Sequence, residues 1–193
     1  MKDEKELRVI QAAKTVFLRY GFRRVTMQDV ADEAAISRPA LYLIYPNKEE
    51  IFKAAARQIA GESIAAIREG LSRFPTIEGK LNFAFDVWTV RTYELMLNAP
   101  DAKDVIDCTH GFARQTIEEI DAEFKKLLLE ILAPLKSRSY KSIVPLPQVA
   151  HLLAASAHGY KESATGVAEL RTMIAGLIKL TLTALQAKQT KAS

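Results

Sequence analysis

Apolar residues recur at intervals of three and four along almost the whole chain, which is the spacing of one face of an α-helix. The first run covers residues 5–20, where Leu7, Ile10 and Phe17 fall on one side. Gly21 then offers a helix end, because glycine adopts a left-handed backbone without steric cost. The alternation of apolar and polar residues that marks a β-strand is nearly absent. The pattern therefore predicts an all-α protein.

Two short helices joined by a tight turn are predicted between Thr26 and Pro46. Thr26 is an N-cap residue, and Asp29 three positions later is a shorter version of the acid that completes a capping box. Ser37 is a second N-cap, and Pro39 fits a first helical turn because the N–H that it lacks has no partner there. The predicted helices are residues 27–34 and 38–45. Such a pair is the helix-turn-helix arrangement, whose second helix lies in the major groove of DNA.

The rest of the chain predicts further helices, separated by proline, glycine and polar residues. They are residues 49–71, 77–98, 101–109 with Asp101 as its cap, 111–135, 147–165 and 167–188. The first of them is long enough to leave one domain and enter the next. We therefore expect a three-helix DNA-binding domain in residues 1–48 and a six-helix domain in residues 49–193.

The composition is that of a folded protein from a reducing compartment. Of the 193 residues, 49% are hydrophobic, which is enough for a buried core. Cys108 is the single cysteine, which excludes an internal disulfide. The longest uncharged run, residues 142–160, contains Pro145 and Pro147, so a membrane span is not expected. We expect a cytoplasmic protein.

The net charge of +4 is typical of a nucleic-acid binder, but the excess is not concentrated near the motif. Residues 1–50 hold nine Lys or Arg and eight Asp or Glu, a net of +1. Placement is more informative than the total, because phosphate contacts give affinity with little sequence information. The basic residues around the motif are Arg19, Arg23, Arg24, Arg38 and Lys48.

The first fifty residues resemble the N-terminal domain of TetR-family transcriptional regulators. The matching positions are Gly21, Phe22, Thr26, Val30, Ala31, Ala34, Ile36, Ser37, Leu41, Tyr42, Tyr45 and Lys48. Ala35 departs from the pattern, since the family usually has glycine at this left-handed helix end, where a Cβ costs about 1 kcal/mol. Leu43 and Ile44 stand where many relatives have polar residues or histidine, so we expect base reading to rest on fewer side chains.

The resemblance implies a sequence-specific DNA-binding regulator that acts as a homodimer on a palindromic double-stranded operator. It also implies that the second domain binds a small-molecule effector and that the effector releases the protein from DNA, as in a repressor. The regulated genes, the effector and the choice between repression and activation stay open. An ordinary helical corner without a DNA function is the alternative for the motif.

Position and chemistry assign roles within the motif. Arg38, at the start of the second helix, can donate two hydrogen bonds to a guanine, and Pro39 and Ala40 can rest against thymine methyl groups. The resemblance gives Tyr42 and Lys48 contacts with phosphates, and the N-terminus of the first helix can bind another. The residues predicted to contact DNA are Arg24, Thr26, Met27, Gln28, Arg38, Pro39, Ala40, Tyr42 and Lys48.

No catalytic, cofactor or metal site is predicted. The three histidines, His110, His151 and His158, lack the spacing of metal ligands on a helix. Asp104 and Asp107 are interpreted as part of a solvated helix face. The sequence has no glycine-rich phosphate loop and no nucleophile elbow, so a helical enzyme is a poorly supported alternative.

Aromatic and polar residues of the second domain can line an effector cavity, because a pocket among bundle helices is apolar with a few polar anchors. The candidates are Phe83, Trp88, Arg91, Tyr93, Cys108, Phe112 and His158. The same residues can instead form the core. The protein would then be a DNA-binding module without an effector, or a helical protein–protein adaptor.

The last two predicted helices carry small and apolar residues on more than one face. One apolar stripe suffices for packing inside a monomer, so the surplus predicts a two-fold interface. A reader of a palindrome needs a dimer to present two recognition helices about one DNA turn apart. Burial of these helices in a large core is the alternative. The predicted interface residues are Leu153, Ala157, Leu170, Ile174, Leu177, Ile178 and Leu182.

Overall fold

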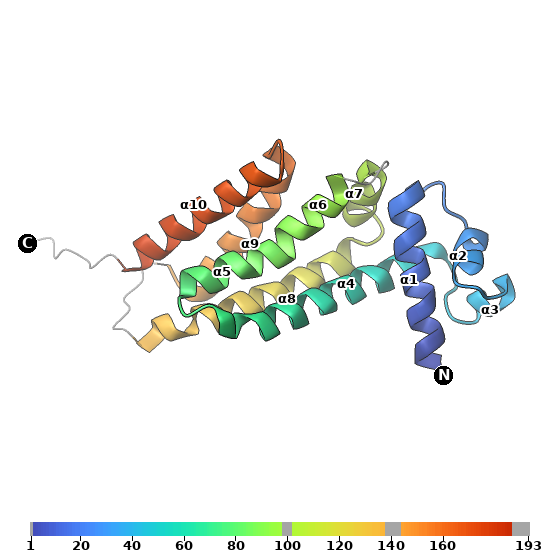
Figure 1. Cartoon of the computed structure of the whole chain (residues 1–193), viewed down its shortest axis with the longest axis horizontal. Coiled ribbons are helices and arrows are strands. Elements are labelled where there is room, and N and C mark those ends of the chain that lie inside the picture. The colour runs from blue at the N-terminus through green and yellow to red at the C-terminus, as the bar shows by residue number, and fades with distance from the viewer. Residues whose placement is uncertain (1, 98–101, 138–143, 187–193) are drawn as a thin grey trace, which may run out of the picture. The chain divides into compact units, whose positions relative to one another are not determined.

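The computed structural model describes residues 2–97, 102–137 and 144–186, and in these ranges the chain is helical without any strand (Figure 1). The helices are α1 Lys2–Tyr20, α2 Met27–Glu33, α3 Arg38–Tyr42, α4 Lys48–Gly70, α5 Ile77–Phe85, α6 Arg91–Leu97, α7 Ala102–His110, α8 Arg114–Leu132, α9 Leu146–Ser163 and α10 Val167–Gln186. Short 3-10 turns follow α4 and α8. The all-α prediction is confirmed.

The predicted ends of some helices differ from the structure. The second helix of the motif ends at Tyr42 rather than at residue 45, and α8 begins at Arg114 rather than at Gly111. The predicted cap Asp101 and the predicted helix ends at residues 98 and 188 lie outside the described residues. Within the described ranges, no helix has the combination of length and apolarity that crossing a membrane requires.

The chain divides into two compact units, one of Met1–Glu62 with Glu94–Ile120 and one of Ser63–Tyr93 with Asp121–Ser193. The domain boundary expected after residue 48 falls inside the first unit. The reason is that the first turns of α4 contribute Ile51, Phe52 and Ala55 to the same core as α1, α2 and α3. Residues 94–120, assigned to the second domain from the sequence, also belong to the first unit.

Four phenylalanines pack against one another in the first unit. Phe17 of α1, Phe22 of the following loop and Phe52 of α4 have ring centroids 5.4 to 5.9 Å apart. Phe112, between α7 and α8, packs against Phe22 and Phe52 at 5.0 and 5.5 Å. Tilted and edge-on pairs at these distances add to the stabilisation from buried area. The cluster joins the helix-turn-helix region to α4 and to the segment after α7.

The core of the second unit is built on α5, α8, α9 and α10. Against this core, the ring of Trp88 stacks on the ring of Phe124, with 4.5 Å between the ring centroids and an interplanar angle of 4°. Trp88 lies in Asp86–Val90, a π-helical segment that joins α5 to α6. The single helix predicted for this region is therefore present but contains a π turn. Asp86 in that turn accepts a hydrogen bond from Arg171 of α10 at 3.0 Å.

Candidate functional site

The N-terminus of α2 has the capping box that the sequence predicted. The N–H of Asp29 donates to the Thr26 hydroxyl at 3.3 Å, while the N–H of Thr26 donates to the Asp29 carboxylate at 2.7 Å. The Thr26 hydroxyl also donates to the same carboxylate at 2.7 Å. These hydrogen bonds favour the charged carboxylate, first through the side chain of Thr26 and then through its backbone, so they lower the pKa of Asp29. The start of α2 is fixed by two local residues.

The turn after α2 takes the left-handed conformation expected at Ala35. Among the described residues other than glycine, Ala35 alone has a positive φ, of 53°. The N–H of Ala35 donates to the Asp32 carbonyl at 3.1 Å, and the N–H of Ile36 donates to the Ala31 carbonyl at 3.0 Å. These two bonds close the helix end. The turn is therefore held by backbone hydrogen bonds against the strain of an alanine Cβ.

Helix α3 has one buried side and one exposed side. Ser37 caps it by accepting a hydrogen bond from the N–H of Ala40 at 3.3 Å, and the Leu41 side chain is completely buried. The guanidinium of Arg38 donates to the Tyr42 hydroxyl at 3.3 Å and lies 5.5 Å from the centre of its ring. The exposed residues of α3 and its C-cap are Arg38, Pro39, Tyr42 and Leu43.

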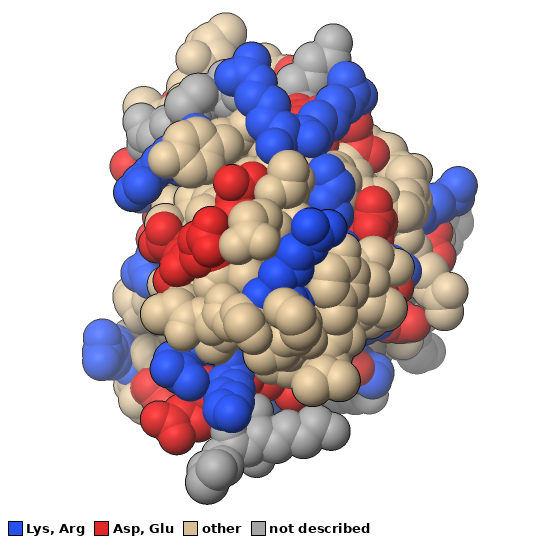
Figure 2. All heavy atoms as spheres, turned by 90° about the vertical axis from the view of Figure 1, so that its right-hand side faces the viewer, with Lys and Arg blue, Asp and Glu red and all other residues tan. Residues whose placement is uncertain are grey.

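Figure 2 looks onto the side of the first unit that carries α2 and α3, where basic side chains lie at several separate places among uncharged and acidic ones. Arg24, Thr26 and Gln28 are exposed, whereas the Met27 side chain is 8% exposed and belongs to the core. Met27 can therefore reach DNA only through its backbone. The N–H groups of Met27 and Gln28, in the first turn of α2, have no partner inside the helix and can bind an anion.

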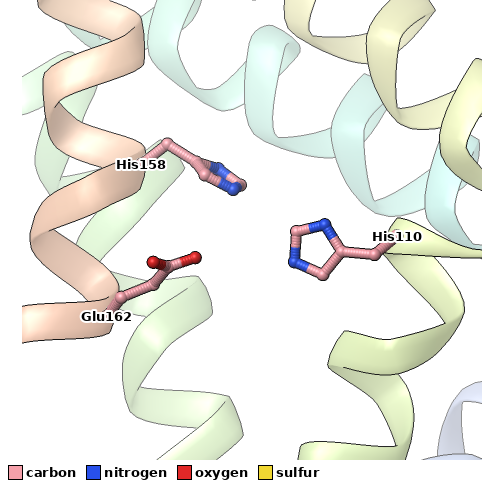
Figure 3. Close-up of side chains that lie close together, drawn as sticks. All are labelled: His110, His158 and Glu162. Atoms are coloured by element: carbon pink, nitrogen blue, oxygen red, sulfur yellow. The ribbon is translucent and has the colours of Figure 1, made fainter.

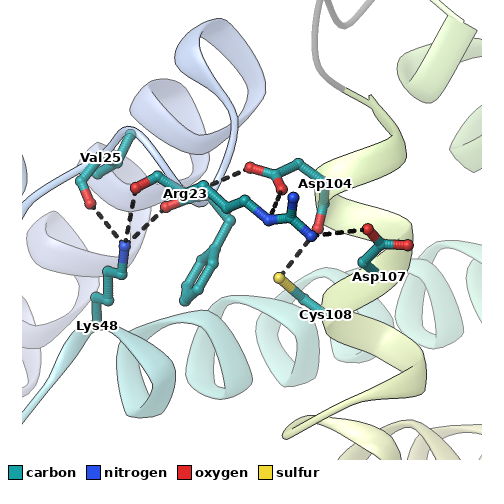
Figure 4. A network of polar contacts seen from close by, with 7 residues as sticks. Arg23, Val25, Lys48, Asp104, Asp107 and Cys108 are labelled. Carbon is teal, nitrogen blue, oxygen red and sulfur yellow. Dashed lines mark hydrogen bonds and ion pairs between the residues drawn. The ribbon is translucent and has the colours of Figure 1, made fainter.

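Lys48 has a role that sequence reasoning missed. Its ammonium donates to the carbonyls of Phe22, Arg23 and Val25 at 3.0, 3.3 and 3.0 Å (Figure 4). It also lies 4.5 Å from the centre of the Phe22 ring. An ammonium has three N–H donors, and all three are directed at this loop. Lys48 thus holds the loop before α2 against the first turn of α4, and the phosphate contact predicted for it stays a prediction.

Arg23 connects the same loop to α7 through a hydrogen bond and two ion pairs. The backbone N–H of Arg23 donates to the Asp104 carboxylate at 2.6 Å, and its guanidinium contacts Asp104 at 2.7 Å and Asp107 at 3.1 Å (Figure 4). The Asp104 side chain is only 13% exposed, so the solvated face expected for this residue is wrong. Burial, with the charges of the two aspartates, raises the pKa of the neighbouring Cys108 thiol to about 11. That thiol is therefore uncharged at neutral pH and poorly reactive.

The first unit also has an open groove of about 440 Å³ between α1 and α4. It is lined by Glu6, Ile10, Tyr45, Glu50, Ala54, Arg57, Gln58, Gly61 and Glu62. Each of its carboxylates already accepts a hydrogen bond from the protein: Glu6 from Tyr45, Glu50 from Lys53 and Glu62 from Lys14 and Gln58. This groove could not be predicted from the sequence, because its walls come from positions about fifty residues apart.

The structure does not gather the predicted effector residues in one unit. Cys108 and Phe112 belong to the first unit, where Cys108 is buried and Phe112 joins the phenylalanine cluster. The second unit holds Phe83, Trp88, Arg91, Tyr93 and His158. Tyr93 is 8% exposed and donates its hydroxyl hydrogen to the Ala164 carbonyl at 2.7 Å.

Sequence reasoning missed two charged residues of the second unit. Burial raises the pKa of Asp121 on α8 and lowers the pKa of Lys161 on α9, while each residue's charge opposes the shift of the other. Figure 3 draws His158 and Glu162, which also project from α9, together with His110. His110 belongs to the first unit, so these three residues form no site within either unit.

The residues predicted for a dimer interface lie mostly inside the second unit. Six of them are 7% exposed or less, namely Leu153, Ala157, Leu170, Ile174, Ile178 and Leu182, and Leu177 is partly exposed. They form the stripe by which α9 and α10 pack into their own core. A different set of small and apolar residues is exposed on these two helices. It comprises Leu152, Ala155 and Gly159 of α9 with Gly176, Leu180 and Ala184 of α10.

Residues 9–55 match the family model described as bacterial regulatory proteins, tetR family. The N-terminal domain belongs to the TetR family. Its motif region is 44% identical over 52 residues to the uncharacterized HTH-type transcriptional regulator YfiR of Bacillus subtilis (strain 168), a match that spans 27% of this chain and 25% of that relative. The chain is also 23% identical over 146 residues to the HTH-type transcriptional repressor KstR2 of Rhodococcus jostii (strain RHA1), with 73% and 70% of the two chains covered.

The fold of the chain is similar to that of solved TetR-family proteins over nearly its whole length. One of them is Thermus thermophilus FadR, a TetR-family transcriptional repressor in complex with lauroyl-CoA. The likeness covers 97% of this chain and 98% of FadR, with a TM-score of 0.65 and 22% identity. At this identity the likeness concerns the fold. The family consists of transcriptional regulators and not of enzymes.

Proposed function

We propose that this TetR-family protein is a homodimeric repressor that binds a palindromic operator and is released by a small molecule. The observation that carries the proposal is the exposed side of α3, where Arg38, Pro39 and Tyr42 face solvent. A recognition helix of this kind enters the major groove. Its site of action would be the cytoplasm, where a bacterial operator lies.

On DNA, the side of α3 that faces solvent would read bases while α2 holds the backbone. Arg38 would turn from Tyr42 to the O6 and N7 atoms of a guanine, a contact that contributes about 1–3 kcal/mol to base discrimination. Arg24 and the N–H groups of Met27 and Gln28 would contact phosphates. Lys48 would act beneath them by keeping the loop before α2 in place.

The dimer would form through the exposed residues of α9 and α10. These helices lie side by side in the second unit (Figure 1), and their inner stripe is already used in its core. Leu152 and Leu180 are 50% and 73% exposed, and a Cβ placed on Gly159 or Gly176 would meet nothing within 4 Å. A flat apolar surface with small residues allows two helix pairs to approach closely. We therefore move the proposed interface from the inner stripe to this outer one.

The repressor mechanism requires an effector that prefers one arrangement of the dimer, because a ligand shifts an equilibrium only through its differential affinity. The effector site would lie in the second unit, with Phe83, Trp88, Arg91, Tyr93 and His158 as candidates. FadR, which shares the fold, was solved with lauroyl-CoA. Acyl-CoA compounds are therefore a reasonable first group to test.

The test of DNA binding is fluorescence anisotropy with the DNA that flanks the gene, at several salt concentrations, beside a scrambled competitor. We expect saturable, salt-sensitive binding to the flanking fragment, weakened at least about fivefold by Arg38→Ala. Arg114→Ala is a matched control, because Arg114 is exposed and makes an ion pair with Glu118 on its own helix. Equal, weak binding to every fragment by both variants and the wild type would contradict the proposal.

A DNA-binding protein without an effector is the second candidate, and one observation favours it. Trp88 and Phe85 both pack on Phe124 in the second unit, as expected where side chains fill the core. Trp88 is the single tryptophan of the chain, so its fluorescence reports on this region. A compound that changes this emission, raises the melting temperature and releases DNA would support the repressor. A broad compound screen with none of these effects would favour the second candidate.

A further inference from the structure

Leu43 is the most exposed large apolar side chain of the described residues, at 88%. It is not a loose residue, because it is the C-cap of α3 with φ −71° and ψ −21° and its N–H donates to the Pro39 carbonyl at 3.2 Å. Its backbone therefore continues the helical turn, and its side chain has a defined direction. A single exposed leucine is common on protein surfaces, so its meaning depends on the residues beside it on the recognition helix.

The exposed side of α3 carries two parallel columns of side chains. Residues four apart lie one above the other on a helix, which pairs Arg38 with Tyr42 and Pro39 with Leu43. The first column is polar and is joined by the hydrogen bond from Arg38 to the Tyr42 hydroxyl. The second column is apolar. Leu41, which points to the other side, is completely buried, so Leu43 lies on the solvent side of α3, next to the column that holds the predicted guanine reader, and not on the core side.

The surroundings of Leu43 identify the kind of partner. Arg38, in the neighbouring column, is exposed and positively charged, which favours an anionic partner such as DNA. In the major groove the one apolar group on a base edge is the C5-methyl of thymine. Cytosine, adenine and guanine present only hydrogen-bonding groups or ring edges at this position.

We propose that Leu43 determines operator specificity by contacting the C5-methyl group of a thymine in each half-site, with Pro39 covering the neighbouring step. The inference rests on the proposed function, since it assigns a base to the same recognition helix. It also revises the expectation that base reading rests on fewer side chains because Leu43 and Ile44 are apolar. Leu43 reads a base through apolar contact.

The test begins with an operator selected from a random-sequence DNA library by the full-length protein. Each thymine of one half-site is then replaced by deoxyuridine, which removes the methyl group and leaves the pairing edge unchanged. We expect a loss of about three- to fivefold at one thymine, the effect of losing one buried methyl contact. Leu43→Ala should bind the thymine and uracil operators equally at that position.

Leu7→Ala is the matched control, because Leu7 is an exposed leucine of the same unit, 51% exposed on α1. It should keep the full preference for thymine over uracil. Leu43→Ala should fold normally, since the side chain makes little contact in the free protein, and an unchanged melting curve verifies this. A loss of affinity in Leu43→Ala without loss of the thymine preference would overturn the inference.

The outcomes separate this inference from the proposed function. If the protein selects no sequence from the library, both fail. If it selects an operator and Leu43→Ala keeps the thymine preference of the wild type, only the role of Leu43 fails. If Leu43→Ala leaves DNA binding unchanged and alters self-association in sedimentation, Leu43 is a protein contact, which also overturns the inference.

Discussion

Ala35 holds the turn between α2 and α3 in a left-handed conformation, at a φ of 53° that a Cβ disfavours. Because the residue is exposed, Ala35→Gly removes strain without removing packing. We expect the substitution to raise the free energy of unfolding by about 0.5–1 kcal/mol in a urea titration. Ala34→Gly is the control: its φ is −78° and its side chain is 5% exposed, so it should lower stability. Equal effects of the two substitutions would show that the turn is not strained.

Two glycines on α4 have opposite surroundings and should respond in opposite ways to alanine. A Cβ on Gly70 would lie 2.4 Å from the Phe83 ring, whereas a Cβ on Gly61 would meet nothing within 4 Å. We expect Gly70→Ala to destabilise the protein by about 1–3 kcal/mol through overpacking. Gly61→Ala should stabilise it by up to about 1 kcal/mol, because alanine favours a helix interior. Thermal unfolding of both variants measures the contrast, and a neutral Gly70→Ala would mean that Phe83 moves aside freely.

At the scale of the element, the capping box makes the stability of helix α2 depend on pH. Hydrogen bonds from Thr26 lower the pKa of Asp29 in the folded state relative to the unfolded state. The contribution of this carboxylate is therefore present above its unfolded pKa and is lost as the pH falls through its lower folded pKa. We expect NMR titration to place the midpoint of Asp29 below the usual range for aspartate. Thr26→Val should move the midpoint upward, and an unchanged midpoint would contradict the capping role.

Lys48 stabilises the loop before α2 through three hydrogen bonds, which an ordinary surface lysine does not make. Lys48→Met removes the donor to three carbonyls, and we expect a loss of about 1–3 kcal/mol in the free energy of unfolding together with weaker DNA binding. Lys53→Met is a control on the same helix, about one and a half turns further along α4. Lys53 makes an ion pair with Glu50 three residues before it, so the substitution should change stability by less than about 0.5 kcal/mol. Similar stability of the two variants in urea would mean that water replaces the Lys48 contacts.

Local signals account for what the sequence predicted well in the motif. Thr26, Asp29 and Ser37 act within three residues of themselves, so the starts of α2 and α3 could be predicted from spacing alone. The contact between the loop before α2 and α7 could not be predicted in this way, because Arg23 and Asp104 are 81 residues apart. Lys48 matched the family pattern, yet nothing in the pattern distinguishes a lysine that contacts phosphate from one that donates to carbonyls. The role of Lys48 depends on whether the tertiary structure brings the carbonyls of the loop before α2 within reach of its ammonium.

For the whole molecule, the all-α fold was predictable because helical periodicity is strong along the chain, but the two faces of α9 and α10 were not distinguishable. Both faces carry small and apolar residues, and periodicity alone does not say which stripe packs inside the unit. The sequence-based choice fell on Leu153, Ile174 and Leu182, which the structure buries in the core of the second unit. The surplus of apolar residues noted in the sequence is real, and it corresponds to the exposed stripe with Leu152 and Leu180.

Leu180 and Leu182 offer a direct test of which stripe forms the dimer, because they are two residues apart on α10 and are 73% and 7% exposed. Leu180→Glu places a charge on the outer stripe, where the free unit tolerates it. We expect a shift from dimer to monomer in analytical ultracentrifugation with little change in helicity, and a loss of operator binding because two recognition helices must act together. Leu182→Ala should instead lower stability by about 2–5 kcal/mol and leave the folded fraction dimeric. A Leu180→Glu variant that stays dimeric would place the interface elsewhere.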